Sequence, residues 1–274
     1  MNNYPYISIS GEDFLIPIAS LKTLRNESLQ TASTIIEALH KECENNIRSI
    51  ILRGSVACGM EIPKHSDFDM MIFPITYFEN QKTIVESLAA NLSKTYRDTY
   101  SVIDLSLIDY KELFDYEINN RMILNAKLTG ITLYGDDLIS DIPNIKFDIN
   151  LAGQISRQAI RETKQNLITL KNGLDKIFYM GVKRDTQFFC IWMMRVICRG
   201  LIAPVMTKKK VFTLNVEVAG KEYISLYPEH ESIITQFLEW EKNPTGNPDI
   251  LYDLVRNFIS KYVEVCVLCK IALR

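Results

Sequence analysis

The chain has 274 residues, enough for one large domain or two modest ones with a sizeable buried core. Apolar residues make up 47% of the sequence and charged residues 23%, a composition that excludes a disordered chain. The formal net charge of −2 argues against wholesale electrostatic binding of a polyanion, so a long RNA is disfavoured as a partner.

Targeting and redox features predict a cytoplasmic protein. The N-terminus has no basic segment followed by an apolar one, so we expect no signal peptide. Charged residues interrupt the most apolar stretches, as Arg195 and Arg199 do, so we expect no membrane span. Cys266 and Cys269 share a C-x-x-C spacing inside an apolar run, which favours two core thiols over a metal site.

The first half of the chain alternates predicted helices with short apolar strands. Residues at helical spacing, such as Ile35, Ile36 and Leu39, predict helices, and short β-branched runs predict strands. In chain order we expect a helix over 27–47, strands over 47–53 and 67–73, a helix over 79–96, a strand over 101–109, a helix over 111–128 and a segment over 131–138 that turns at Gly135. This order predicts an α+β domain with a small sheet over residues 1–143.

Beyond residue 147 the strand-like runs become rare. Long helical patterns occur at 150–172, 184–202, 230–241 and 248–273. Pro143 lies in the polar stretch that separates the two halves and predicts a boundary there. We therefore expect a second, all-α domain over residues 144–274.

A Gly-Ser pair comes directly after the strand predicted at 47–53. Gly54 permits a sharp backbone turn and a close approach to a ligand. Ser55 adds a hydroxyl where a helix begins, and the backbone N–H groups at such a turn suit an anion. The pair alone is a weak signal, and it gains weight from the acidic residues downstream.

Three carboxylates occur on the next two predicted strands. Asp67 and Asp69 are two residues apart and project from the same strand face, about 7 Å apart, with Phe68 directed into the core. Mg²⁺ relieves the repulsion of such a pair and is bound through one or two carboxylates plus phosphate oxygens. Asp104 lies inside an apolar strand, which is costly unless the group is paired or on a metal. An Asp-x-Asp pair alone is often structural, but this combination favours phosphoryl or nucleotidyl transfer.

The segment LRGSVACGMEIPKHSDFDMMIF, residues 52–73, resembles the signature of the DNA polymerase β-like nucleotidyltransferase superfamily. The resemblance implies a palm-like mixed sheet with flanking helices and the metal-dependent transfer of a nucleoside monophosphate from a nucleoside triphosphate. It also implies residue roles: Gly54 and Ser55 hold the triphosphate, Ser66 adds a hydroxyl to the phosphates, and Asp67, Asp69 and Asp104 hold one or two Mg²⁺ ions.

Two features depart from that signature. Arg53 stands where these proteins usually have an apolar or aromatic residue. The spacing from Gly54 to Asp67 is one residue longer than in the antibiotic-modifying members and resembles that of the members that synthesise oligonucleotides or cyclic dinucleotides.

The second half resembles the C-terminal helical domain of the streptomycin/spectinomycin adenylyltransferases. The segment MRVICRGLIAPVMTKKKVF carries Arg195 and Lys208, and the resemblance implies that both contact the nucleotide phosphates. An arginine fork and a lysine point charge suit a triphosphate. The alternatives are an ion-paired Arg195 and a solvated turn at Lys208.

We therefore predict a Mg²⁺-dependent nucleotidyltransferase that moves AMP from ATP to a hydroxyl of a small molecule, with an aminoglycoside-like antibiotic as the candidate acceptor and antibiotic resistance as the candidate role. Asp104 is the candidate general base. One alternative keeps this chemistry with RNA, a protein or a nucleotide as acceptor, as in toxin-type or signalling enzymes. The other is a catalytically inactive nucleotide-binding module, which the presence of all three carboxylates argues against.

Overall fold

The computed structural model describes residues 6–173, 178–179, 182–183 and 185–272. The chain divides into two compact units, which we call the sheet unit, Ile16–Ile145, and the helical unit, formed mainly by the chain after Lys146. Residues 6–15 also belong to the helical unit, whereas the sequence placed them in the first domain. The reason is backbone pairing, since the Ile7 N–H donates to the Phe212 carbonyl at 2.8 Å.

The sheet unit contains a four-stranded mixed sheet in the order β3-β2-β1-β4. Its elements are α1 (Asn26–Glu42), β1 (Ile47–Arg53), α2 (Gly54–Ala57), β2 (Phe68–Pro74), α3 (Glu79–Thr95), β3 (Ile103–Leu107), the 3-10 helix η1 (Tyr110–Phe114), α4 (Tyr116–Thr129), β4 (Ile131–Gly135) and α5 (Leu138–Asp141). Strand β1 runs antiparallel to both β2 and β4, and β2 runs parallel to β3. The predicted mixed sheet with flanking helices is confirmed.

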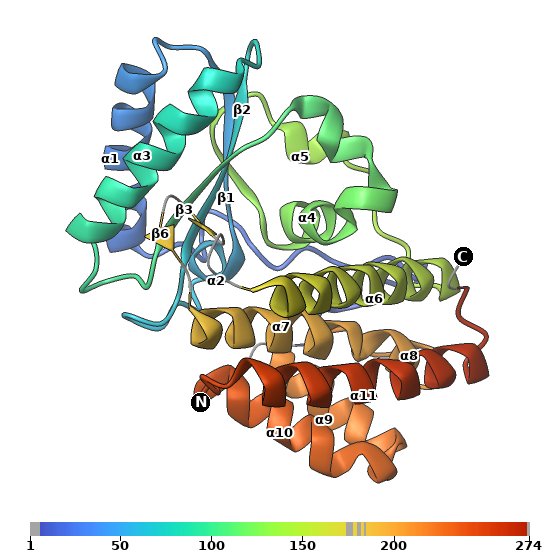
Figure 1. The fold of residues 1–274 in the computed structure, drawn as a ribbon. Helices are drawn as coiled ribbons and strands as arrows, with labels where there is room; N and C mark the ends of the chain where they lie inside the picture. Colours follow the sequence, from blue (N-terminus) through green and yellow to red (C-terminus); the bar gives the residue numbers. More distant parts are fainter. Residues whose placement is uncertain (1–5, 174–177, 180–181, 184, 273–274) are drawn as a thin grey trace. The chain divides into compact units, whose positions relative to one another are not determined.

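Alternate side chains of each strand are buried on opposite faces of this sheet. Alternate residues such as Ile50 and Met70 pack in one cluster with α1 and α3, on one side of the sheet in Figure 1. Their neighbours, such as Ile51 and Met71, pack in a second cluster with α4 and α5 on the other side. Because side chains alternate along a strand, Asp69 faces the side of Met71 and α4.

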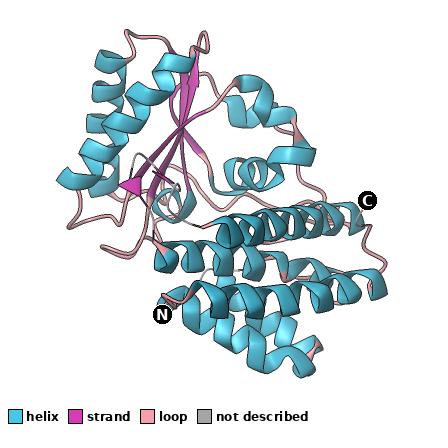
Figure 2. Cartoon of the chain, in the orientation of Figure 1, coloured by secondary structure: helices cyan, strands magenta, loops and turns pink. Residues whose placement is uncertain are grey.

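The second half of the chain is almost entirely helical (Figure 2). Its elements are α6 (Ile149–Asn172), β5 (Phe178–Tyr179), β6 (Val182–Lys183), α7 (Thr186–Gly200), α8 (Ile202–Met206), α9 (Val216–Leu226), the 3-10 helix η2 (Pro228–His230), α10 (Glu231–Lys242) and α11 (Pro248–Leu268). Asp148, Asp185 and Asn247 cap the starts of α6, α7 and α11 by accepting backbone N–H groups. Helix α9 and the β5–β6 pair were not predicted, and residues 184 and 273, at predicted helix ends, lie outside the described part.

The segment Thr186–Met206 is long and apolar enough to cross a membrane by length and composition, with a mean hydropathy of 1.7. In the structure 72% of its most apolar window is buried. It packs mainly against α6 and α10, so the core of the helical unit accounts for its apolar character. Cys266 lies in α11, and Cys269 is the C-cap of that helix. Both are buried and form no disulfide, as predicted for core thiols.

Candidate active site

Two of the three predicted carboxylates lie side by side on the sheet. Asp69 of β2 and Asp104 of β3 are register partners on neighbouring parallel strands. Asp104 is only 6% exposed and accepts a hydrogen bond from the Ser106 hydroxyl at 2.9 Å. The two strands are thus neighbours in the sheet, which places two acids in one row on its α4 side.

The third carboxylate has a different partner. Asp67 lies one residue before β2, and its carboxylate accepts a hydrogen bond from the Ser101 hydroxyl. Within the described residues, no group of three Asp, Glu, His or Cys side chains has the arrangement of a metal site. The pair Asp69 and Asp104 fits Mg²⁺, which typically takes one or two carboxylates with phosphate oxygens. A ligand role for Asp67 stays a prediction.

Gly54 lies directly against the Asp69 carboxylate. It begins α2 with φ of +81°, and a Cβ there would come within 2.8 Å of Asp69 Oδ2. Its N–H donates to Thr129 Oγ1 at 3.1 Å. A side chain would be strained at this φ and would displace the carboxylate, so the position requires glycine. Thr129, at the end of α4, was missed because nothing in its local sequence ties it to the Gly-Ser turn.

The two predicted serines hold local structure. Ser55 lies in α2, and its carbonyl accepts the Met60 N–H at 2.9 Å. The Ser66 hydroxyl accepts the Ile62 N–H at 2.9 Å and so closes the loop that leads to Asp67. Neither hydrogen bond uses the proton of the serine hydroxyl, and the predicted phosphate contacts stay predictions.

Cys58 is the one thiol within the motif, and it is buried. Burial raises the pKa of the Cys58 thiol to about 11. The group therefore stays protonated near neutral pH and is a poor nucleophile, which argues against covalent chemistry at this residue.

A buried glutamate that sequence reasoning missed anchors the same loop. Glu61 accepts a hydrogen bond from the Ser28 hydroxyl at 3.0 Å and pairs with Arg25 at 3.3 Å. Arg25 also donates to the Gly59 carbonyl at 3.2 Å. These contacts tie the loop between α2 and β2 to the start of α1. In the sequence Glu61 resembles any other polar loop residue, and no local pattern distinguishes it.

Arg195 of α7 forms the ion pair that the sequence left open as an alternative. Its Nε donates to Glu241 Oε1 of α10 at 2.9 Å, and both side chains are partly exposed. The contact orients the guanidinium and does not test whether Arg195 binds phosphate. That role stays a prediction.

Lys208 differs from the two lysines that come after it. Lys209 pairs with Glu222, and Lys210 pairs with Asp13, both at 2.6 Å. Lys208 is exposed and forms no ion pair among the residues that the structure describes. The lysine that was predicted to contact phosphate is therefore the one of the three without a carboxylate partner in the described part of the chain.

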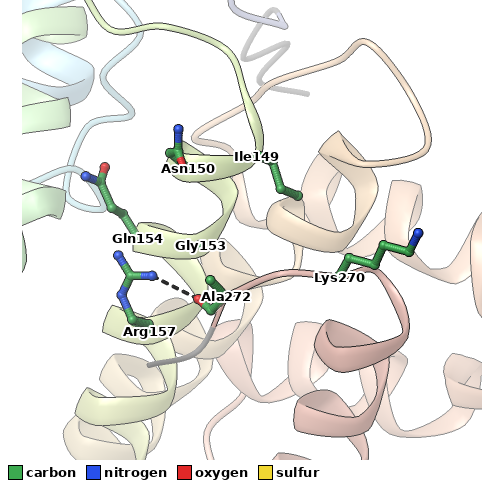
Figure 3. A pocket seen from close by; sticks show the side chains of 7 residues that line it. All are labelled: Ile149, Asn150, Gly153, Gln154, Arg157, Lys270 and Ala272. Carbon is green, nitrogen blue, oxygen red and sulfur yellow. Dashed lines mark hydrogen bonds between the residues drawn. The ribbon is translucent and has the colours of Figure 1, made fainter.

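The helical unit also contains a pocket at the start of α6 (Figure 3). Arg157 reaches across it to the Ala272 carbonyl at 2.8 Å. The residues that line it are Ile149, Asn150, Gly153, Gln154, Arg157, Lys270 and Ala272. None of them belongs to the predicted site.

The structure resembles a solved nucleotidyltransferase. Spectinomycin adenyltransferase AAD(9) from Enterococcus faecialis, determined with ATP and spectinomycin, matches with a TM-score of 0.53 and 16% sequence identity over 85% of this chain and 98% of that chain. The sequence matches no protein-family model and no curated protein. The structural match shows the fold: the chain shares the architecture of that adenyltransferase, with a mixed four-stranded sheet and a helical C-terminal region.

Proposed function

We propose that this chain is a Mg²⁺-dependent nucleotidyltransferase that transfers AMP from ATP to a hydroxyl of a small molecule. The candidate acceptor is an aminoglycoside-like antibiotic. The similar structure, which was determined with ATP and spectinomycin, supports both the nucleotide and the class of acceptor.

The observation that carries the proposal is the pairing of Asp69 with Asp104, with Gly54 against the Asp69 carboxylate. Two hard oxygen donors lie in one row, and a glycine backbone leaves room beside them. This arrangement suits a divalent cation that carries phosphate oxygens. When bound, the cation would neutralise charge that develops on the phosphate oxygens.

In the proposed reaction, residues of the chain accept a proton and bind the phosphates. The acceptor oxygen forms a bond to the α-phosphorus while the bond from that phosphorus to the bridging oxygen breaks, and pyrophosphate leaves. Asp104 takes the proton of the acceptor hydroxyl, since its carboxylate lies beside Asp69 in the row. The proposed contacts to the phosphates come from Ser55, Ser66, Arg195 and Lys208.

We also propose a reducing, cytoplasmic setting. All six cysteines are buried and unpaired, which supports this assignment.

Incubation of the full chain with Mg²⁺, labelled ATP and a panel of aminoglycosides that includes spectinomycin tests the proposal. We expect label on a drug together with released pyrophosphate. Asp69→Asn should lower the rate of transfer by at least about a hundredfold, because it removes a charged ligand without changing the size of the side chain.

The matched control is Asp136→Asn, which removes a carboxylate that is 61% exposed and paired with Arg48. It should leave transfer unchanged. Label on RNA or protein alone would move the acceptor to another class while keeping the chemistry. Bound ATP with no pyrophosphate release for any acceptor would refute the transferase proposal.

A further inference from the structure

Arg53 places a positive charge beside a proposed metal ligand. It is the last residue of β1 and the register partner of Asp69 on the antiparallel strand β2. Its Nη2 lies 3.5 Å from Asp69 Oδ1, and the two side chains are 18% and 19% exposed. Since Asp69 is also the partner of Asp104, the three residues form one row across three neighbouring strands.

The Asp69 carboxylate is confined on both sides. Arg53 lies near Oδ1, and the backbone of Gly54 lies so close to Oδ2 that a Cβ would be only 2.8 Å away. Arg53 and Gly54 are consecutive residues, so one turn of the chain sets both contacts. The guanidinium therefore lies where β1 ends and the proposed phosphate-binding turn begins.

A guanidinium in this position weakens the binding of a divalent cation and strengthens the binding of a triphosphate. It keeps its proton at any ordinary pH, so it repels a divalent cation that approaches Asp69. At a few ångströms in a partly buried site, this repulsion changes affinity by on the order of tenfold after screening. A triphosphate instead attracts it, because phosphate oxygens match the fork of its N–H donors.

We propose that Arg53 makes divalent-cation binding at Asp69 depend on the nucleoside triphosphate. Without nucleotide it serves as the counter-ion of Asp69 and weakens binding of a bare cation. With nucleotide it contacts the phosphates and no longer opposes the cation. This inference rests on the proposed nucleotidyltransferase function. It gives a role to Arg53, the residue that stands where the nucleotidyltransferase signature usually has an apolar or aromatic side chain.

The test measures Mn²⁺ binding to the full chain by electron paramagnetic resonance, with and without an α,β-methylene analogue of ATP. Arg53→Gln should bind Mn²⁺ about tenfold more tightly than the wild type without the analogue. The enhancement of Mn²⁺ affinity by the analogue should shrink by a similar factor. Arg53→Lys keeps the charge and should stay near the wild type.

The matched control is Arg48→Gln, which removes an arginine from the same strand whose partner, Asp136, lies 2.8 Å away. It should leave Mn²⁺ binding unchanged. Arg53→Met keeps the packing of the side-chain stem and carries the same expectation if Arg53→Gln does not fold.

Two results would overturn the inference, and they are distinguishable. If folded Arg53→Gln or Arg53→Met binds Mn²⁺ like the wild type under both conditions, the role of Arg53 is wrong while the transferase proposal stands. If neither the wild type nor any variant binds Mn²⁺ even with the analogue, the proposed function is wrong, and the inference is wrong with it.

Discussion

Gly54→Ala tests whether the Gly-Ser turn shapes the Asp69 carboxylate. The substitution adds one methyl group at a residue with φ of +81°, where it would lie 2.8 Å from Asp69 Oδ2. The backbone strain and the contact are separate effects. Gly173, the C-cap of α6, separates them, because its φ is +90° and, among the described residues beyond its chain neighbours, no atom lies within 4 Å of the added Cβ.

The backbone strain costs about 1 kcal/mol at Gly54 and about 1–3 kcal/mol at Gly173, whose ψ of 145° places it in a region that only glycine adopts readily. Gly54→Ala must also move the Asp69 side chain from its rotamer, which adds about 1 kcal/mol. We therefore expect a loss of about 2 kcal/mol for Gly54→Ala and one of about 1–3 kcal/mol for Gly173→Ala. Each kcal/mol corresponds to a thermal shift of about 2–4 °C in a domain of this size range.

The functional difference should be much larger than the difference in stability. A displacement of a catalytic group by about 1 Å costs on the order of a hundredfold in rate, so Gly54→Ala should lose about that much AMP transfer. Gly173→Ala should keep it. Measurement of AMP transfer and of thermal unfolding for both variants separates a loss of activity from a loss of stability. A folded Gly54→Ala variant with transfer within about twofold of the wild type would refute the reasoning.

Three further predictions concern stability. Gly200→Ala should lose about 1–3 kcal/mol in denaturant unfolding, because its Cβ would lie 2.6 Å from Ala159 Cβ, and the double variant with Ala159→Gly should recover part of this loss. Glu61→Gln should lose about 1 kcal/mol in the same assay, since it removes a buried charge paired with half-exposed Arg25, and an unchanged midpoint would contradict the anchoring role. Burial lowers the pKa of His230, so the unfolded state binds more protons below the ordinary pKa of 6.5, and the free energy of unfolding should fall as the pH drops from about 7 to about 5. His230→Phe should remove that part of the pH dependence.

The regular elements could be predicted because their apolar patterns are long and consistent. The predicted strand over 47–53 matches β1, and the predicted helices over 79–96 and 150–172 match α3 and α6 within a residue at each end. Helix α9 was not predicted because its 11 residues include Gly220 and three β-branched residues, all of which disfavour a helix in the sequence. Residues 6–15 were assigned to the other unit because their contacts, such as that of Ile7 with Phe212, are with residues far away in sequence.

The site could be predicted only in part. The alternation of side chains along a strand places Asp67 and Asp69 on one face, but register decides which residue stands beside each acid. The sequence indicated that the three acids could converge only if their strands were neighbours; the register that pairs Asp69 with Asp104 and the partners Ser101 for Asp67 and Arg53 for Asp69 were not predicted. Hydrogen bonds between side chains far apart in sequence leave no local pattern from which to predict them.

Register also bears on the longer spacer between Gly54 and Asp67. The loop closes on itself before β2 begins, since the Ser66 hydroxyl accepts the Ile62 N–H, and Lys64 adopts a φ of +65°. An added residue in such a loop widens a turn, and it leaves the antiparallel pairing of β1 with β2 unchanged. A shift of one residue in that pairing would instead turn Asp69 to the opposite face of the sheet. The spacing can therefore vary while the row of Arg53, Asp69 and Asp104 stays intact, so the spacer length by itself does not argue against adenylyl transfer to a small molecule.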